Sequence, residues 1–399
     1  MGAFNWLDGT ILIMDIIIII ALILLINTYL VKALNNKYDI RPESYLWILF
    51  GVHLILTVSY ILYAFATRSD SFGYYDRASR AENWLGLLVY GTSFIDFLAW
   101  PLVKLFSLSY VAVMILFSYL GYIAIVLFYL ALNENVKLKP VWNNLSAKEL
   151  VFLLPNLHFW SASLGKGSVI LLGLGFFIFG LSRFNRGARG FFIFLGALLT
   201  MMIRPHIFLT LVTSVMIGIL ITRSGIKPYI KWLIFSIALI LFFYLSQDVM
   251  KFTNTDSLDV LSSNSINHRA EELSKSNSGV DITNYNLVMK MFTFWFRPLF
   301  VDASGALGLI VSIENVLYLF FFLVTIKSAV QNWLHWNGWF RISIFVFLLG
   351  SFILAQVTGN LGIAMRQKAQ FMPFFFIIYC KALTYQQFAY KRKNQINPV

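Results

Sequence analysis

The chain has 399 residues, of which 59% are hydrophobic, 17% aromatic and only 12% charged. That composition leaves too little polar surface to cover a soluble globule of this size, so it excludes a soluble enzyme and predicts an integral membrane protein. The formal net charge of +13 could suggest nucleic acid, but the basic residues follow the ends of apolar segments. We therefore expect no nucleic-acid partner, and membrane lipids as neighbours.

The apolar segments predict an all-α, polytopic transmembrane bundle of about eleven helices, because roughly 20 apolar residues cross a hydrocarbon core. We treat residues 1–399 as one transmembrane domain with external segments at 67–107 and 247–300. The predicted spans are 10–31, 45–66, 108–132, 149–163, 167–182, 189–203, 206–222, 229–247, 306–326, 341–359 and 370–388.

Basic residues fall in alternate connections, at 32–41, 137–148, 183–189, 223–231, 327–341 and 391–393. The positive-inside rule makes that side cytoplasmic, with the N-terminus outside and the C-terminus in the cytoplasm of a bacterial inner membrane. The first apolar segment lacks a basic start and a following A-x-A pattern, so we interpret it as a retained helix. The single cysteine, Cys380, supplies neither a disulfide nor a thiolate metal site.

Two breaks between short apolar segments, at Leu164-Gly165-Lys166 and Arg204-Pro205-His206, are typical of hairpins with tips inside or at the outer leaflet. Polar backbone at that depth is tolerated where it is buried in protein or lines a wet cavity. We therefore expect a cavity open to the outside. Within the external segment 67–107, two short aromatic stretches are typical of interfacial helices on the outer leaflet. We expect residues 247–286 to form a mobile polar loop.

The densest cluster of charged side chains is the stretch from Arg68 to Glu82. If this stretch is helical, Asp70, Tyr74 and Arg77 share one face while Asp76 and Arg80 share another. Asp70 is then either a helix-capping residue or a catalytic carboxylate, and we favour a general base. Asp76 is expected to pair locally with Arg80.

Other predicted outward-facing groups are cationic, and ionisable groups at membrane depth are functional candidates by default. Guanidinium and ammonium groups suit a phosphorylated ligand. Simpler roles exist for some of them: snorkelling for Arg204, anchoring for Lys166 and core packing for His158. His335 and Glu314 are interpreted as structural, the latter through a buried hydrogen bond near Asn315. The predicted substrate and phosphate ligands are Arg77, Arg80, His158, Lys166, Arg204, His206, Arg297, Arg366 and Lys368.

Three motifs together resemble the GT-C superfamily of polytopic glycosyltransferases and the bacterial surface-polysaccharide transferases and polymerases. They are S-D-S-F-G-Y-Y with residues 78–106 behind it, L-P-N-L-H-F-W-S-A-S-L-G-K-G, and T-G-N-L-G-I-A-M-R-Q-K-A-Q-F-M-P. In that family an external loop opens with an aspartate just after a transmembrane helix. The resemblance implies Asp70 as the base, a polyprenyl-(di)phosphate-linked sugar donor, and a glycan or lipid acceptor outside the cytoplasm.

The chain departs from the family pattern in two ways. It carries an additional N-terminal span, Thr10 to Tyr29, before the helix that precedes the aspartate. It also lacks the D-x-D-like motif, so we expect no cofactor and do not favour a divalent cation. Three alternatives stay open: a polysaccharide polymerase that depends on external arginines, a lipid-linked glycan flippase or transporter, and a non-catalytic scaffold.

Overall fold

A computed structural model describes residues 6–67, 69–183, 189–222, 227, 229, 231–233, 235–236, 239–240, 279–303 and 305–396. In these ranges the chain is helical apart from connections and two isolated β-bridges, Trp142 with Leu145 and Gly279 with Asn360. The chain forms two compact units: residues 1–135 with 140–204, and residues 136–139 with 205–399. The all-α prediction is confirmed for the described part of the chain.

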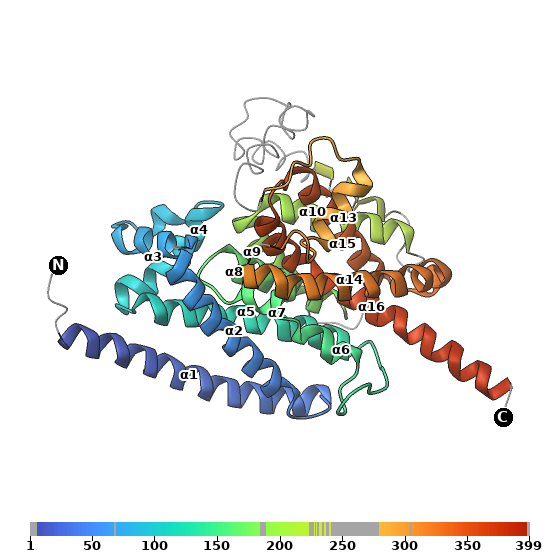
Figure 1. The fold of residues 1–399 in the computed structure, drawn as a ribbon, viewed down its shortest axis with the longest axis horizontal. Coiled ribbons are helices and arrows are strands. Elements are labelled where there is room, and N and C mark those ends of the chain that lie inside the picture. The colour runs from blue at the N-terminus through green and yellow to red at the C-terminus, as the bar shows by residue number, and fades with distance from the viewer. Residues whose placement is uncertain are drawn as a thin grey trace. The chain divides into compact units, whose positions relative to one another are not determined.

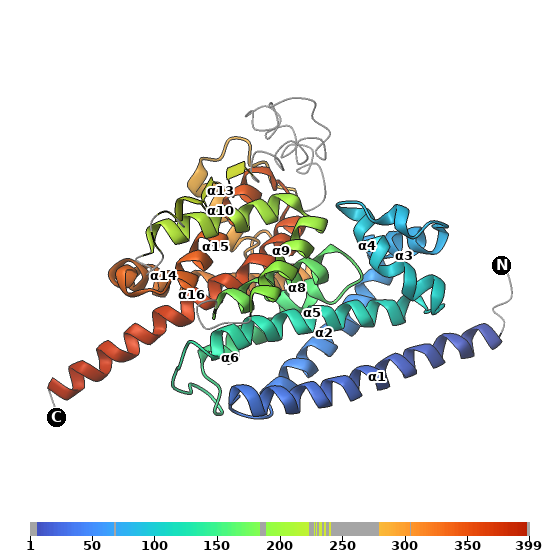
Figure 2. The same ribbon diagram turned by 180° about the vertical axis from the view of Figure 1, so that it is seen from behind.

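The first unit begins with three long apolar helices. They are α1 (Trp6–Tyr38), α2 (Tyr45–Thr67) and α5 (Tyr110–Asn133). In both views α1 runs alongside α5 (Figures 1 and 2). Most side chains of α1 are exposed along its membrane-length stretch, whereas two thirds of the corresponding stretch of α5 is buried. An exposed helix this apolar is suited to a lipid environment, while α5 is the more buried of the two helices.

Between α2 and α5 the chain forms four short helices, which we call the α3–α4 segment (residues 69–108). They are α3 (Asp70–Arg80), η1 (Leu85–Leu87), α4 (Thr92–Trp100) and the π-helical turn η2 (Pro101–Leu105). The aromatic stretches predicted as interfacial helices correspond to η1 and to α4 with η2. Because α2 ends and α5 begins at this segment, it lies at one end of both helices (Figure 1).

The remaining helices of this unit continue from α5 through a polar connection. They are α6 (Ala147–Leu150), η3 (Val151–Leu153), α7 (Pro155–Ser161), α8 (Lys166–Leu181) and α9 (Gly190–Ile203). Helices α7 and α8 meet at an angle of 113° across residues 162–165, at the break that the sequence predicts. Glycines let the backbones of α8 and α9 approach closely: a Cβ at Gly196 would lie 2.4 Å from the carbonyl oxygen of Gly173.

The second unit contains α10 (Pro205–Ile221), α13 (Leu287–Phe296), α14 (Gly305–Asn332), η6 (Trp333–His335), α15 (Gly338–Val357) and α16 (Leu361–Ile396). Its core lies where α15 packs against α16: a Cβ at Gly350 would overlap the ring of Phe371, at 2.2 Å from its nearest atom. The prediction of a mobile loop at 247–286 falls outside the described residues up to 278, and so does most of the predicted span 229–247.

Five helices are long and apolar enough to cross a membrane, or six if α7 and α8 together make one span. The five overlap the predicted spans 10–31, 45–66, 108–132, 306–326 and 341–359. The predicted spans 189–203 and 206–222 correspond to shorter apolar helices, α9 and α10, and 370–388 lies within the 36-residue α16. The membrane-protein prediction is supported at this level, and the count of about eleven remains a prediction.

Candidate functional site in the α3–α4 segment

Helix α3 carries the charged cluster that the sequence singles out. It begins at Asp70 and runs unbroken through Gly73 to Arg80. Asp70, Tyr74 and Arg77 therefore share one face, as expected from a period of 3.6 residues. The exposed Asp70 lies in the first turn, where the helix dipole favours a carboxylate.

The two aspartate–arginine pairs of α3 differ in burial. Asp76 and Arg80 form the predicted local pair, with 2.8 Å between carboxylate and guanidinium, and both side chains are exposed. Arg77 instead reaches α4, where its Nε and Nη2 donate to the two carboxylate oxygens of Asp96 at 2.7 and 3.1 Å. The Asp96 side chain is 3% exposed and that of Arg77 is 47% exposed. Arg77 is therefore anchored at one edge and open to solvent at the other.

Electrostatics reinforce this arrangement. The hydrogen bond to Asp96 raises the pKa of Arg77, and the charge of Asp70 adds to that effect. Burial raises the pKa of the Asp96 carboxyl, opposed by the Arg77 guanidinium and by the positive charge of Lys166. The Arg77 guanidinium also lies 5.0 Å from the centre of the Tyr74 ring. Charges of alternating sign are thus brought together from α3, α4 and the start of α8.

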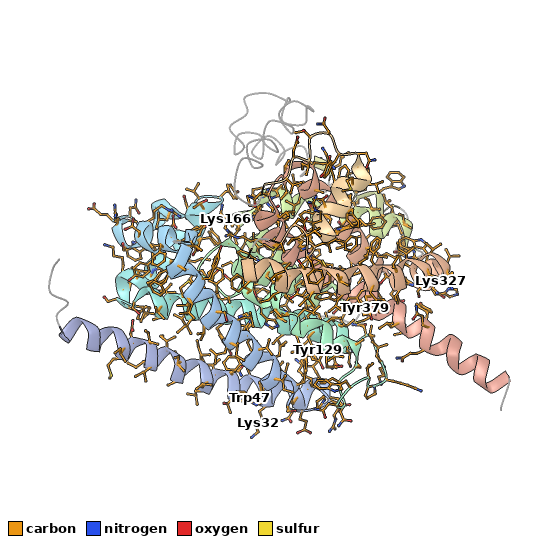
Figure 3. The ribbon with its side chains drawn as sticks, in the orientation of Figure 1. Lys32, Trp47, Tyr129, Lys166, Lys327 and Tyr379 are labelled. Atoms are coloured by element: carbon orange, nitrogen blue, oxygen red, sulfur yellow. The ribbon has the colours of Figure 1, made fainter. Side chains whose placement is uncertain are left out.

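Lys166 is the first residue of α8, immediately after the α7–α8 break. Gly165 before it packs against Tyr74, because a Cβ there would lie 3.4 Å from the ring carbon Cε2. Figure 3 labels Lys166 beside the α3–α4 segment, away from Lys32 and Trp47 near the α1–α2 connection. The break therefore places the half-buried ammonium group of Lys166 beside the charged cluster of α3 and α4.

Arg204 belongs to the same unit and follows the last residue of α9. The backbone of Gly91 donates to the carbonyl oxygen of Met202 at 2.7 Å, so the end of α9 is tied to the α3–α4 segment. One end of the first unit consequently brings together charged residues that are far apart in the sequence. They are Asp70, Arg77, Lys166 and Arg204.

The surface beside the cluster is apolar. Trp84 stacks on Phe97 and Trp100, with ring centres 5.0 and 5.7 Å apart. Around Trp84, large apolar side chains face outward: Leu85, Leu88 and Val89 are each about half exposed or more. An exposed aromatic and aliphatic loop is typical of a segment that rests in a membrane interface.

His158 lies elsewhere in this unit and is fully buried. Its Nε2 contacts the Phe152 carbonyl oxygen at 2.7 Å and its Nδ1 contacts Nδ1 of His53 at 3.0 Å. Both ring nitrogens are therefore engaged with protein atoms, which matches the core-packing alternative better than a substrate role.

The second unit holds the other predicted ligands. Lys368 is fully buried, and its Nζ donates to the carbonyl oxygens of Trp295 and Arg297 and to Oδ1 of Asn315, at 3.3, 3.0 and 2.6 Å. These three acceptors use all three N–H groups of the ammonium, so we assign Lys368 a structural role. Arg297 is paired with Asp302. His206 and Arg366 are half-buried.

Glu314 of α14 has the buried hydrogen bond expected for it, since the Tyr318 hydroxyl donates to its Oε2 at 2.6 Å. Neighbouring Asn315 donates to the Pro298 carbonyl oxygen at 2.7 Å. In the described ranges, no three His, Cys, Asp or Glu side chains gather as a metal-binding group.

Sequence reasoning missed two residues that organise the first unit. Asp96 was visible only as a polar interruption between aromatic stretches, and its partner lies 19 positions away. Asp15 of α1 accepts from the backbone N–H of Ser109 at 2.6 Å and thereby caps α5 from another helix. An isolated acidic residue in an apolar helix was the available signal.

Comparisons with protein-family models, with curated proteins and with solved structures find no match for this chain.

Proposed function

We propose that the protein is an integral membrane glycosyltransferase that moves a sugar from a polyprenyl-(di)phosphate-linked donor to a glycan or lipid acceptor on the extracytoplasmic face. The observation that carries the proposal is the grouping of an exposed carboxylate, Asp70, with the cations Arg77 and Lys166 beside an exposed apolar loop. A lipid-linked donor needs both features, because its phosphate lies at the membrane surface and its tail lies below it.

In this proposal Asp70 accepts the proton from the acceptor hydroxyl as that oxygen attacks the anomeric carbon of the donor sugar. A positioned general base contributes typically about 10²- to 10⁴-fold. The bond from the anomeric carbon to the phosphate oxygen breaks, and negative charge develops on the leaving phosphate. Arg77, Lys166 and Arg204 stabilise that charge electrostatically.

The finer architecture belongs to the same proposal. We propose a GT-C-like bundle with about eleven crossings, in which α9, α10 and part of α16 add to the helices that are long and apolar enough to cross a membrane. The phosphate-binding roles of Arg297, Arg366 and His206, which belong to the second unit, stay predictions from the sequence.

The test is turnover by the full-length protein reconstituted in liposomes, assayed with a panel of polyprenyl-phosphate and polyprenyl-diphosphate sugars. We expect Asp70→Asn to lower the transfer rate by about 10² or more while donor binding persists. Asp76→Asn is the matched control, because Asp76 lies on the same helix in an exposed pair, and it should retain near wild-type turnover. Unchanged turnover in Asp70→Asn would remove Asp70 as the base.

A polysaccharide polymerase is the second candidate, favoured by the solvent-open guanidinium edge of Arg77. In that case Arg77→Lys should cost more turnover than Asp70→Asn, because a lysine cannot reproduce the bidentate geometry. Movement of lipid-linked glycan across the liposome membrane without covalent product would instead indicate a flippase or transporter.

A further inference from the structure

Two buried histidines meet ring to ring in the first unit. His53 of α2 is 2% exposed and His158 of α7 is fully buried, and their Nδ1 atoms lie 3.0 Å apart. The opposite nitrogen of each ring faces a backbone carbonyl oxygen: His53 Nε2 lies 2.9 Å from that of Ser118, and His158 Nε2 lies 2.7 Å from that of Phe152. The two rings therefore make three short polar contacts.

Each of these contacts needs one proton on nitrogen. A carbonyl oxygen can only accept, so both Nε2 atoms must carry a proton. With both Nε2 atoms protonated, two neutral imidazoles turn bare lone pairs toward each other at 3.0 Å. Any other arrangement of two protons leaves a ring nitrogen lone pair facing a carbonyl oxygen. Three contacts thus require three protons, one more than two neutral rings supply.

We infer that His53 and His158 bind one additional proton and share it between their Nδ1 atoms. The pair takes this proton from solvent and carries a single positive charge as an imidazole–imidazolium pair. A buried charge is costly unless it is hydrogen-bonded. Here the charge is spread over two rings, and every ring N–H has an acceptor. This inference is independent of the proposed glycosyl transfer.

The surroundings of the pair are polar but uncharged. On α2, the Thr57 hydroxyl donates to the His53 carbonyl oxygen at 2.7 Å and lies 2.5 Å from the Ser118 hydroxyl of α5. The Tyr122 ring of α5 lies 6.1 Å from the His53 ring, and its hydroxyl donates to the Leu46 carbonyl oxygen. On α7, the Ser161 hydroxyl donates to backbone carbonyls. In the described part of the chain, neither ring has a hydrogen-bonded carboxylate to compensate the charge.

The contacts of the two rings connect four elements. The shared proton joins α2 to α7, and the Nε2 contacts join the rings to α5 and to η3. Helix α7 is the half of the bent α7–α8 pair that precedes the break leading to Lys166. Loss of the proton would set two lone pairs against each other and loosen α7 from α2.

The direct test is nitrogen-15 NMR of the full-length protein with labelled histidines in lipid nanodiscs near pH 7. The expected result is one proton coupled to two ring nitrogens, with both Nε2 atoms protonated, and its loss in both His53→Asn and His158→Asn. Two neutral rings without a proton between the Nδ1 atoms would overturn the inference. This measurement can be made on the wild-type protein alone, so it does not depend on whether the variants fold.

The second measurement is Tm in detergent at about pH 7 and about pH 9, both above the ordinary histidine pKa of about 6.5. Over this range the histidines of the unfolded chain are mostly neutral. A proton that the folded pair still holds therefore stabilises the folded protein, and that stability is lost as pH rises through the pKa of the pair. We expect the wild-type Tm to fall toward pH 9. In His158→Asn the amide N–H can donate to His53 Nδ1 without an added proton, so this fall should shrink. An equal fall in both proteins would contradict the inference.

Discussion

The two ion pairs of α3 show how burial decides what a charged contact contributes. Asp76 and Arg80 are both in solvent, where an (i, i+4) pair contributes about 0.3–0.5 kcal/mol. Asp96 is removed from solvent and held by two hydrogen bonds from Arg77. The Asp96 pair is therefore the one that fixes the position of the Arg77 guanidinium.

We expect Asp96→Ala to lower the free energy of unfolding by about 1.5–3 kcal/mol, the range for hydrogen bonds to charged groups. The loss should stay below the 3–5 kcal/mol typical of breaking a fully buried pair, because the half-exposed Arg77 can be hydrated. Denaturant or thermal unfolding in detergent measures the effect, with Asp76→Ala as the exposed counterpart. Equal effects of the two substitutions would show that burial of Asp96 does not distinguish the pairs.

At this scale the sequence predicts what depends on local spacing. The Asp76–Arg80 pair and the shared face of Asp70, Tyr74 and Arg77 follow from helical periodicity alone. The partners of Arg77 and His158 could not be predicted, because they lie 19 and 105 positions away and depend on how helices pack.

Helix packing in the first unit depends on close backbone approach at glycines. At Gly121 of α5, a Cβ would lie 2.1 Å from the carbonyl oxygen of Ser161, which is backbone and cannot rotate away. At Gly51 of α2, nothing lies within 4 Å of such a Cβ. Alanine at Gly121 therefore tests the packing of α5 against α7, whereas alanine at Gly51 tests helix propensity alone.

We expect Gly121→Ala to destabilise the protein by about 1–3 kcal/mol or more through overpacking of α5 against α7. Gly51→Ala should be neutral or stabilising by up to about 1 kcal/mol, because alanine is the better helix former. Thermal unfolding in detergent compares them directly. A stability loss in Gly51→Ala as large as in Gly121→Ala would contradict the close α5–α7 contact.

Among the elements, the long apolar helices and the break before Lys166 could be predicted, since hydrophobicity and a Ser-Leu-Gly interruption are local signals. The capping of α5 by Asp15 of α1 could not, because it joins helices 94 positions apart. The 36-residue length of α16 was also not predicted, because the hydrophobic pattern marks only its apolar part and polar residues continue the helix beyond it.

At the scale of the whole molecule, membrane insertion follows from five or six helices of sufficient length and hydropathy. The predicted count of about eleven exceeds this for several reasons. Helices α9 and α10 have 14 and 17 residues, short of the roughly 20 that cross a bilayer unaided. The predicted spans 149–163 and 167–182 end in the bent α7–α8 pair, which makes at most one span, and 370–388 lies within α16, which is not among the five. Most of 229–247 lies outside the described residues. The orientation rests on the distribution of basic residues, so it needs its own test.

We predict that Glu82 is extracytoplasmic and that Val141 is cytoplasmic, because the membrane-spanning α5 lies between them. The native Cys380 is buried and should give little background labelling. A membrane-impermeant thiol reagent applied to intact cells should label Glu82→Cys and leave Val141→Cys unlabelled until the cells are opened. The reverse pattern would move Asp70 to the cytoplasmic side and exclude a donor on the outer face.

A density map of the full-length protein in nanodiscs with an added polyprenyl phosphate would test the proposed donor site most directly. We expect the phosphate within hydrogen-bonding distance of Arg77 or Lys166, with Asp70 facing the space where the sugar would lie. The polyprenyl tail should pass the exposed apolar loop around Trp84. A phosphate bound away from the α3–α4 segment, with Asp70 remote from it, would contradict the proposed site.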